Sequence, residues 1–194
     1  MGGLADLLAQ DRAALTVPRA TRTARAPGGP GGPGAGRSGR SGAWHDAAMT
    51  TASHTLEIDA PRSAVFAILD DVGRTPEWQP RCLGVEKLSP GPTGVGTDLR
   101  YTFKDGPRTG QMTGKVTAHH PGERFAMEYD DRLMGVVVDF FLHEGASPTG
   151  TSLTHTVRVR GHGLGRLFAP IVARTLPRQT VAAMESLKRL AEDG

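Results

Sequence analysis

One histidine stands among apolar residues at a spacing that would place its ring inside a folded domain. Residues 151–160 alternate polar and apolar, so Leu153, His155 and Val157 share one face of an expected strand. Imidazole can donate or accept a proton near neutral pH, which makes histidine the commonest general acid or base. His155 is therefore the candidate catalytic residue. The alternative is a structural histidine, which is the more frequent role of such a ring on an apolar face.

Two tyrosines could supply further polar groups to the same interior. Tyr101 and Tyr129 each alternate with charged or polar residues in an expected strand. A tyrosine hydroxyl can orient a ligand by hydrogen bonding, although an amphipathic tyrosine at the rim of a core is the commoner role. Both roles stay open.

Metal chemistry is not expected from the histidine spacing. His119 and His120 are adjacent in an expected loop, whereas His143, His155 and His162 lack the helical or cysteine-paired spacing of metal ligands. The sequence predicts neither a metal nor a cofactor.

The remaining polar patterns have simple structural interpretations. Residues 161–165, Gly-His-Gly-Leu-Gly, lack the Lys-Ser/Thr ending of a phosphate loop and are expected to form a hinge between a strand and a helix. The paired carboxylates at 70–71 and 130–131 fall at expected element ends, where capping and solubility account for them.

Cys82 is the only cysteine of the chain. No internal disulfide can form, and a reducing compartment fits this usage. No run of residues approaches the length and hydrophobicity of a membrane span, and the first residues lack the apolar core of a signal peptide. We therefore expect a cytoplasmic protein without integral membrane contact.

The elements that must position these side chains follow from the periodicity. A strand at 55–59 leads into a helix that starts near Pro61, and a second short helical turn spans 75–79. Six alternating segments then run from Cys82 to residue 160, separated by short Gly and Pro turns. From Leu164 to Ala191 apolar residues recur at helical spacing, with a kink expected near Pro177. The fold class is α+β, a curved antiparallel sheet around one long C-terminal helix.

Charge and composition divide the chain at Met49. Residues 1–48 are rich in Gly, Pro and Arg and carry six arginines against three aspartates, which accounts for the whole net charge of +3. Such a segment cannot offset the entropy of ordering its backbone, so we expect a disordered tail at 1–48, one domain at 49–194, and Met49 as a possible true start. The domain itself is neutral and has no basic stripe, so nucleic-acid binding is not expected.

The order of these elements resembles the helix-grip fold of the START/Bet v 1 (SRPBCC) superfamily, and specifically its polyketide cyclase/dehydrase-like branch. The resemblance rests on five segments in order: 58–66 with Ile-Asp-Ala-Pro, 70–78 ending in Pro-Glu-Trp, 94–96, 121–125 and 150–153. It also shows in the closing helix, at 187–190 with Leu-Lys-Arg-Leu. It covers about residues 53–192. What it implies is a hollow between the sheet and the C-terminal helix that takes lipids, isoprenoids, polyketides or other small hydrophobic molecules.

Inward positions of the strands and the helix would line such a hollow, because ligand pockets are mostly apolar with a few polar groups. The expected lining residues, besides His155, are Trp78, Leu99, Tyr101, Phe103, Met112, Gly114, Phe125, Met127, Tyr129, Val138, Phe140, Leu153, Val157, Phe168, Ile171 and Met184. The alternative is that these side chains simply fill the core.

Two classes of function stay open from the sequence. The first is a protein that binds or carries a small hydrophobic ligand. The second is a cofactor-independent polyketide cyclase or dehydratase that acts in the same cavity. The sequence does not indicate an oligomeric state.

Overall fold

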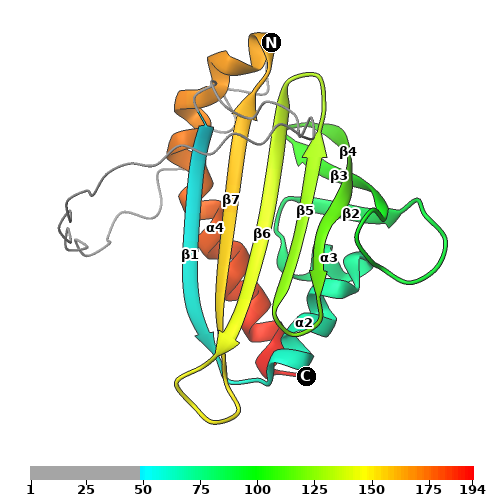
Figure 1. Ribbon diagram of the computed structural model, residues 1–194. Coiled ribbons are helices and arrows are strands. Elements are labelled where there is room, and N and C mark those ends of the chain that lie inside the picture. Colours follow the sequence, from blue (N-terminus) through cyan, green and yellow to red (C-terminus); the bar gives the residue numbers. More distant parts are fainter. Residues whose placement is uncertain (1–48) are drawn as a thin grey trace, which may run out of the picture. The chain divides into compact units, whose positions relative to one another are not determined.

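The computed structural model describes residues 49–194, apart from the side chains of Asp105 and Arg108, and the predicted tail lies outside these residues. The described chain begins with one strand and three short helices, continues through six consecutive strands and ends in a helical segment (Figure 1). The strands are β1 (Met49–Ile58), β2 (Cys82–Lys87), β3 (Asp98–Asp105), β4 (Arg108–His120), β5 (Arg124–Asp130), β6 (Met134–Glu144) and β7 (Thr151–Gly161). The helices are α2 (Arg62–Asp70), η2 (Val72–Arg74), α3 (Thr75–Trp78), η3 (Gly163–Phe168) and α4 (Ala169–Glu192).

The seven strands form one antiparallel sheet in the order β1-β7-β6-β5-β4-β3-β2. Consecutive strands from β2 to β7 are neighbours, and β1 closes the far side by pairing with β7. The side chains of β7 alternate between buried and half-buried along almost its whole length, as period 2 requires when one face covers the core. The predicted order of elements and the antiparallel sheet are confirmed.

Strand β1 begins six residues earlier than the sequence pattern predicts. Its first half, from Met49, pairs with the last residues of β7, with Met49 opposite Arg160. This half contains Thr, Ala, Ser and His in place of strong apolar residues, so local patterning gives no signal for it. This half of β1 is a strand because it pairs with β7.

A β-bulge in β4 overturns one prediction about the sheet. The alternation of Met112, Gly114, Val116 and Ala118 predicts one shared face, but the register shifts between Val116 and Ala118. Beyond the bulge His119 pairs with Phe125, so His119 takes the inward place that the pattern gives to Ala118. An extra residue in one strand flips every later side chain to the opposite face.

Helix α4 lies across one face of the sheet, behind the strands in Figure 1, and packs mainly on β1. It is a single α-helix that continues through Pro177, while residues 164–168, which the sequence pattern assigns to the same helix, belong to the 3-10 turn η3. Its buried side chains lie mostly in the second half: Leu176, Thr180, Ala183, Met184, Leu187 and Ala191. The C-terminal half of α4 therefore covers the core.

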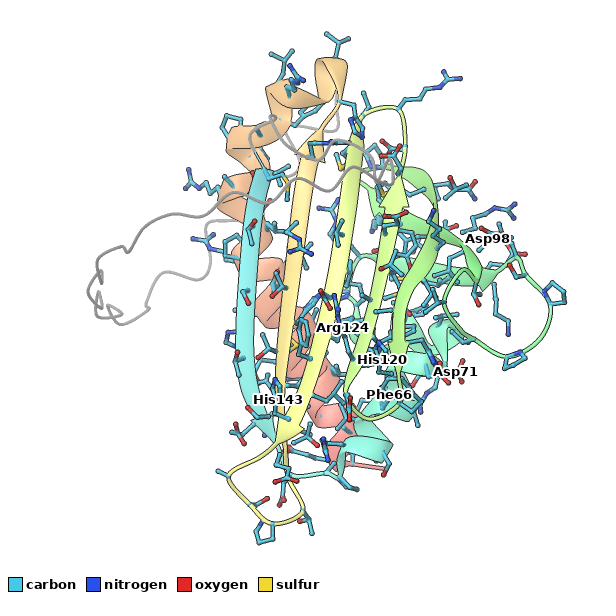
Figure 2. The ribbon with its side chains drawn as sticks, viewed as in Figure 1. Phe66, Asp71, Asp98, His120, Arg124 and His143 are labelled. Atoms are coloured by element: carbon cyan, nitrogen blue, oxygen red, sulfur yellow. The ribbon has the colours of Figure 1, made fainter. Side chains whose placement is uncertain are left out.

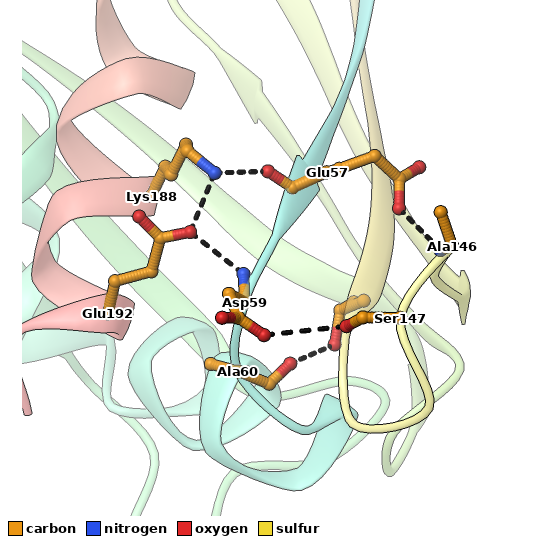
Figure 3. A network of polar contacts seen from close by, with 8 residues as sticks. Glu57, Asp59, Ala60, Ala146, Ser147, Lys188 and Glu192 are labelled. Carbon is orange, nitrogen blue, oxygen red and sulfur yellow. Dashed lines mark hydrogen bonds and ion pairs between the residues drawn. The ribbon is translucent and has the colours of Figure 1, made fainter.

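A polar network fixes this C-terminal half in place (Figure 3). Lys188 donates to the backbone carbonyl of Glu57 and to Glu192, and Glu192 accepts a hydrogen bond from the backbone N–H of Asp59 at 2.8 Å. The carboxylate of Glu57 accepts from the backbone N–H of Ala146, in the β6–β7 loop, at 2.9 Å. These contacts join the end of α4, the end of β1 and the β6–β7 loop.

Within residues 49–194, no helix has the length and hydrophobicity needed to cross a membrane.

Candidate functional site

His155 lies in the interior, as its strand pattern predicts. Its side chain is 2% exposed, and its ring stacks on Phe140 of the neighbouring strand with centroids 4.3 Å apart and an interplanar angle of 12°. Neither ring nitrogen has a hydrogen-bond partner among the described residues. The ring is thus held by packing alone, with its polar atoms unused.

The environment of His155 favours the neutral imidazole. Burial lowers the pKa of His155 to about 3, with a smaller contribution from His54, which lies directly opposite it on β1. A neutral ring offers one N–H donor and one acceptor at once. Because no described side chain orients the ring by hydrogen bonding, the structure gives His155 no partner of a catalytic dyad.

Trp78 reaches the same part of the core from α3. Its ring meets Phe140 edge-on, with centroids 5.9 Å apart, and its indole N–H is buried without a partner in the described part of the chain. Trp78, Phe140 and His155 therefore form a three-ring stack that carries three unpaired nitrogen atoms. Buried polar groups are normally paired, so three unpaired nitrogen atoms within one group of rings are unusual.

A second aromatic group lies on the same face of the sheet, over β3, β4 and β5. Tyr101 stacks on Phe103 with ring centroids 5.6 Å apart, and Tyr101 meets Tyr129 at 5.4 Å. Tyr129 is buried and donates its hydroxyl to the sulfur of Met127, whereas Tyr101 and Phe103 remain half-buried. We call these three rings, Tyr101, Phe103 and Tyr129, the aromatic platform.

Burial keeps both tyrosines of the platform un-ionised. Desolvation raises the pKa of Tyr101 and of Tyr129 well above the ordinary value for a phenol. Each hydroxyl is therefore a neutral hydrogen-bonding group at physiological pH.

Glycines of β4 allow the platform to lie flat on the sheet. A Cβ atom at Gly110 would overlap the ring of Phe103, and one at Gly114 would overlap both the ring of Tyr129 and the backbone carbonyl of Glu128. Large rings that cover cross-strand glycines are a recognised device for stabilising sheets. Gly114 therefore leaves no open space of its own, because the ring of Tyr129 fills the position that its side chain would take.

The other predicted lining residues fall into three environments. The main core takes most of them: Leu99, Met112, Phe125, Met127, Phe140, Leu153 and Met184, with Val138 half-buried against it. Val157 belongs to a separate small cluster with Ala52, Val159 and Leu176. Phe168 and Ile171 are half-buried at the start of α4, outside both clusters. The structure thus gathers most of these residues on one face, and the ligand cavity stays a prediction.

A small cavity and an open hollow lie elsewhere in the described domain, and neither of these two is lined by a residue that the sequence assigns to the ligand site. A cavity of about 10 Å³ lies between the start of α4 and the β1 and β7 ends, lined among others by Thr50, Met134 and Val172. It is no larger than one water needs. An open hollow of about 510 Å³ lies between α2 and the β4–β5 turn, where Arg62, Phe66 and Glu123 contribute to its walls. Phe66 is labelled beside this turn in Figure 2.

The structure also reveals a pair that the sequence analysis missed. Nε2 of His119 lies 2.8 Å from a carboxylate oxygen of Asp70, and the ring of His119 meets Phe66 edge-on at 5.4 Å. The sequence interpretation placed His119 in a loop and gave Asp70 a capping role, but β4 extends through His120 and Asp70 makes no cap. The alternating pattern of β4 does not predict this pair, because the bulge turns the side chain of His119 to the opposite face of the sheet.

Cys82 is buried at the start of β2 and has no features of a nucleophile. Desolvation raises the pKa of its thiol to about 11, which keeps it protonated. The structural interpretation of this residue therefore agrees with its environment.

The opposite face of the sheet carries a charged pair, Arg124 and Asp139. Arg124 binds the buried carboxylate of Asp139 through two hydrogen bonds, of 3.0 and 2.8 Å, and lies over the ring of Phe141. Figure 2 shows Arg124 and His143 on this face, with α4 behind the sheet. The two faces are thus chemically distinct.

A seven-stranded antiparallel sheet covered by one long C-terminal helix is the helix-grip fold, which a solved START superfamily protein shares. The chain belongs to the polyketide cyclase/dehydrase and lipid transport family, whose model matches residues 49–192. Membership of this family supports a role in hydrophobic ligand binding or polyketide processing. No curated protein sequence matches the chain.

Solved structures share this fold at low sequence identity. The Zhui aromatase/cyclase from Streptomyces sp. R1128 is 18% identical, with a TM-score of 0.62 over 75% of this chain and 94% of that one. A START superfamily protein from Mycobacterium smegmatis is 18% identical, with a TM-score of 0.60 over 74% and 97% of the two chains. Ara h 8.0201 is 15% identical, with a TM-score of 0.58 over 76% and 100%.

Proposed function

We propose that this protein binds one small hydrophobic molecule, of lipid, isoprenoid or polyketide type, between the inner face of the sheet and α4. The observation that carries the proposal is the aromatic platform. Tyr101 and Phe103 lie on the same face as fully buried neighbours such as Leu99, yet they remain half-buried. Flat aromatic surfaces on a concave, apolar face suit a ligand with rings or an isoprenoid chain.

The structure of α4 supports a route for entry to this face. The C-terminal half is fixed by buried side chains and by the polar network around Lys188 and Glu192. Ile171 in the N-terminal half and Phe168 just before it are half-buried and belong to neither core cluster. Movement of this half about Pro177, an internal proline that removes one helical hydrogen bond, would open the edge of the sheet formed by β1 and β7, against which α4 packs.

The polar atoms of the three-ring stack favour a ligand that is not a pure hydrocarbon. Trp78 offers a donor, and neutral His155 offers a donor and an acceptor. A ring hydroxyl or ketone that reaches this stack would pair groups whose isolation costs about 1–3 kcal/mol each. Hydroxylated or keto-bearing ligands should therefore bind more tightly than alkanes of equal size.

Native mass spectrometry of the freshly purified protein tests the proposal directly, because it detects a co-purified ligand without assuming its identity. Titration with the apolar dye 1-N-phenylnaphthylamine provides the second measurement. Phe103→Ala removes one ring of the platform and should weaken dye binding, while Phe141→Ala removes a half-buried ring from the opposite face and serves as the control. Equal dye affinity in the two folded variants would exclude the platform as the binding surface.

The second candidate function is that of a cofactor-independent cyclase or dehydratase in the same place. Two solved structures of the same fold are titled aromatase/cyclases, Zhui and the di-domain StfQ, and this favours keeping the candidate. If His155 acts as general acid or base, His155→Phe should leave ligand affinity near normal and lower turnover by about 10²–10⁴-fold. Unchanged turnover on a confirmed substrate would end the catalytic assignment, and we favour the binding protein.

A further inference from the structure

An apolar patch lies at the end of the domain where β7 passes into α4. Leu164 and Leu167 in η3 are each 74% exposed, and Leu133 in the β5–β6 turn is 42% exposed. The two segments touch, because the backbone N–H of His162 donates to the carbonyl of Leu133 at 2.6 Å. A Cβ atom at Gly165 would overlap that same carbonyl, so η3 lies directly against the turn.

The chain segment that contains this patch is rich in arginine. Residues 145–184 contain five arginines, at 158, 160, 166, 174 and 178, and no aspartate or glutamate, although Arg158 already pairs with Asp139. Arg166 lies between the two exposed leucines in sequence and is itself exposed. Exposed leucines can insert at a membrane interface, and neighbouring arginines are attracted to anionic headgroups.

The acidic residues nearest to the patch are already engaged. Asp130 binds the ring of His162, with 2.8 Å between the carboxylate oxygen and Nε2, and Asp131 accepts from the backbone N–H groups of Leu133 and Met134 at 2.7 Å. These two carboxylates offset part of the local charge and hold the turn in shape.

The described part of the chain starts at the same end, because Met49 is the first residue of β1 and pairs with Arg160, just before η3. The preceding residues 1–48 carry six arginines against three aspartates in sequence. A basic composition in both segments suits an anionic surface.

We propose that η3 and the β5–β6 turn dock this protein onto an anionic lipid surface, with Leu164 and Leu167 inserted at the interface and the arginines at the headgroups. A second copy of the chain fits less well, because a two-fold contact through this patch would bring Arg166 against its own counterpart. This proposal goes beyond ligand binding and does not depend on it, since vesicle binding is measured without any ligand.

Sedimentation of the full-length protein with vesicles tests the proposal. One set of vesicles is pure phosphatidylcholine, and the other contains about one quarter phosphatidylglycerol. We expect at least about tenfold stronger partitioning onto the anionic vesicles, weakened by added salt. The double substitution Leu164→Ser with Leu167→Ser should lower this partitioning at least about tenfold.

Matched controls separate docking from a general loss of apolar surface. Leu83 and Leu88, at 54% and 43% exposed, lie in and just after β2, and their double substitution to Ser should leave partitioning unchanged. If the Leu164/Leu167 variant fails to fold by circular dichroism, Arg166→Gln replaces it and should lower anionic binding about fivefold.

Three results would overturn the proposal. The first is equal partitioning of the parent and the folded Leu164/Leu167 variant. The second is equal partitioning onto neutral and anionic vesicles. The third is absence of vesicle binding together with a dimer, seen by sedimentation velocity, that the Leu164/Leu167 variant loses. That result would assign the patch to a second copy of the chain.

Discussion

Replacement of the buried histidine His155 by phenylalanine should remove a large part of the acid sensitivity of this fold. The ring is 2% exposed, stacks on Phe140, and has no hydrogen-bond partner among the described residues. Phenylalanine keeps an aromatic ring at this position and has no titratable group. The variant therefore isolates the cost of protonating a buried imidazole.

The size of the effect follows from the two pKa values. The pKa of His155 falls from 6.5 for an unburied histidine to about 3 in the folded protein. Below pH 6.5 the unfolded state binds the proton more tightly, so stability is fully present above 6.5 and is lost as the pH falls toward 3. A pH of about 5 lies roughly 1.5 units below the pKa of 6.5 in the unfolded state, and this corresponds to a loss of about 2 kcal/mol in the free energy of unfolding.

Urea unfolding at about pH 7.5 and about pH 5 measures this loss for the parent and for His155→Phe. We expect the difference in unfolding free energy between the two pH values to be smaller in the variant by about 2 kcal/mol. His143→Phe, which changes an exposed histidine of the same sheet, is the control and should keep the slope of the parent. An equal pH dependence in parent and His155→Phe would refute the account of a buried, neutral ring. If phenylalanine overpacks the site, His155→Leu gives the same comparison.

Three further changes test other parts of the structure. Gly114→Ala should destabilise the protein by about 2 kcal/mol or more, because its Cβ would overlap backbone, while Gly84→Ala, whose Cβ meets nothing within 4 Å, should cost much less in the same thermal melts. Arg124→Ala should lower the unfolding free energy by about 2 kcal/mol, because it leaves the buried carboxylate of Asp139 without its two hydrogen bonds, and a loss below about 0.5 kcal/mol would contradict this. A chain that starts at Met49 should keep its melting temperature and its ligand binding, and a fall of more than a few degrees would show that residues 1–48 pack on the domain.

Local periodicity predicted the order of the strands and most of the long helix, but not the first half of β1. The alternation around Leu153 and His155, and the helical spacing from Leu176 to Leu187, express burial on one face, which is a property of the segment itself. The same rule failed at the bulge in β4 and at η3. Both departures depend on contacts between segments, with β5 in one case and with the carbonyl of Leu133 in the other.

The burial of the candidate residues was predictable from the sequence, and their arrangement was not. Inward positions follow from strand parity, so His155, Tyr101 and Phe140 could be placed on the core face. The edge-on contact of Trp78 with Phe140, the cover of Tyr129 over Gly114 and the pairing of Asp70 with His119 join residues far apart in sequence. Their geometry depends on sheet register and on how closely α4 approaches, and neither is encoded in a local pattern.

The central claim is that a hydrophobic ligand binds between the inner face of the sheet and α4, and two adjacent valines of β6 test it most directly. Val138 faces the core and Val137 faces the opposite side, and both are half-buried. Val138→Trp should fill space on the ligand face, and Val137→Trp should add the same ring outside it.

Fluorescence titration of 1-N-phenylnaphthylamine, with folding verified by circular dichroism, gives the decisive comparison. If the ligand site lies on the face of Val138, we expect about one dye site in the parent and in Val137→Trp, and at least about tenfold weaker binding in Val138→Trp. Equal binding in the two tryptophan variants, or no dye binding by the parent, would contradict it.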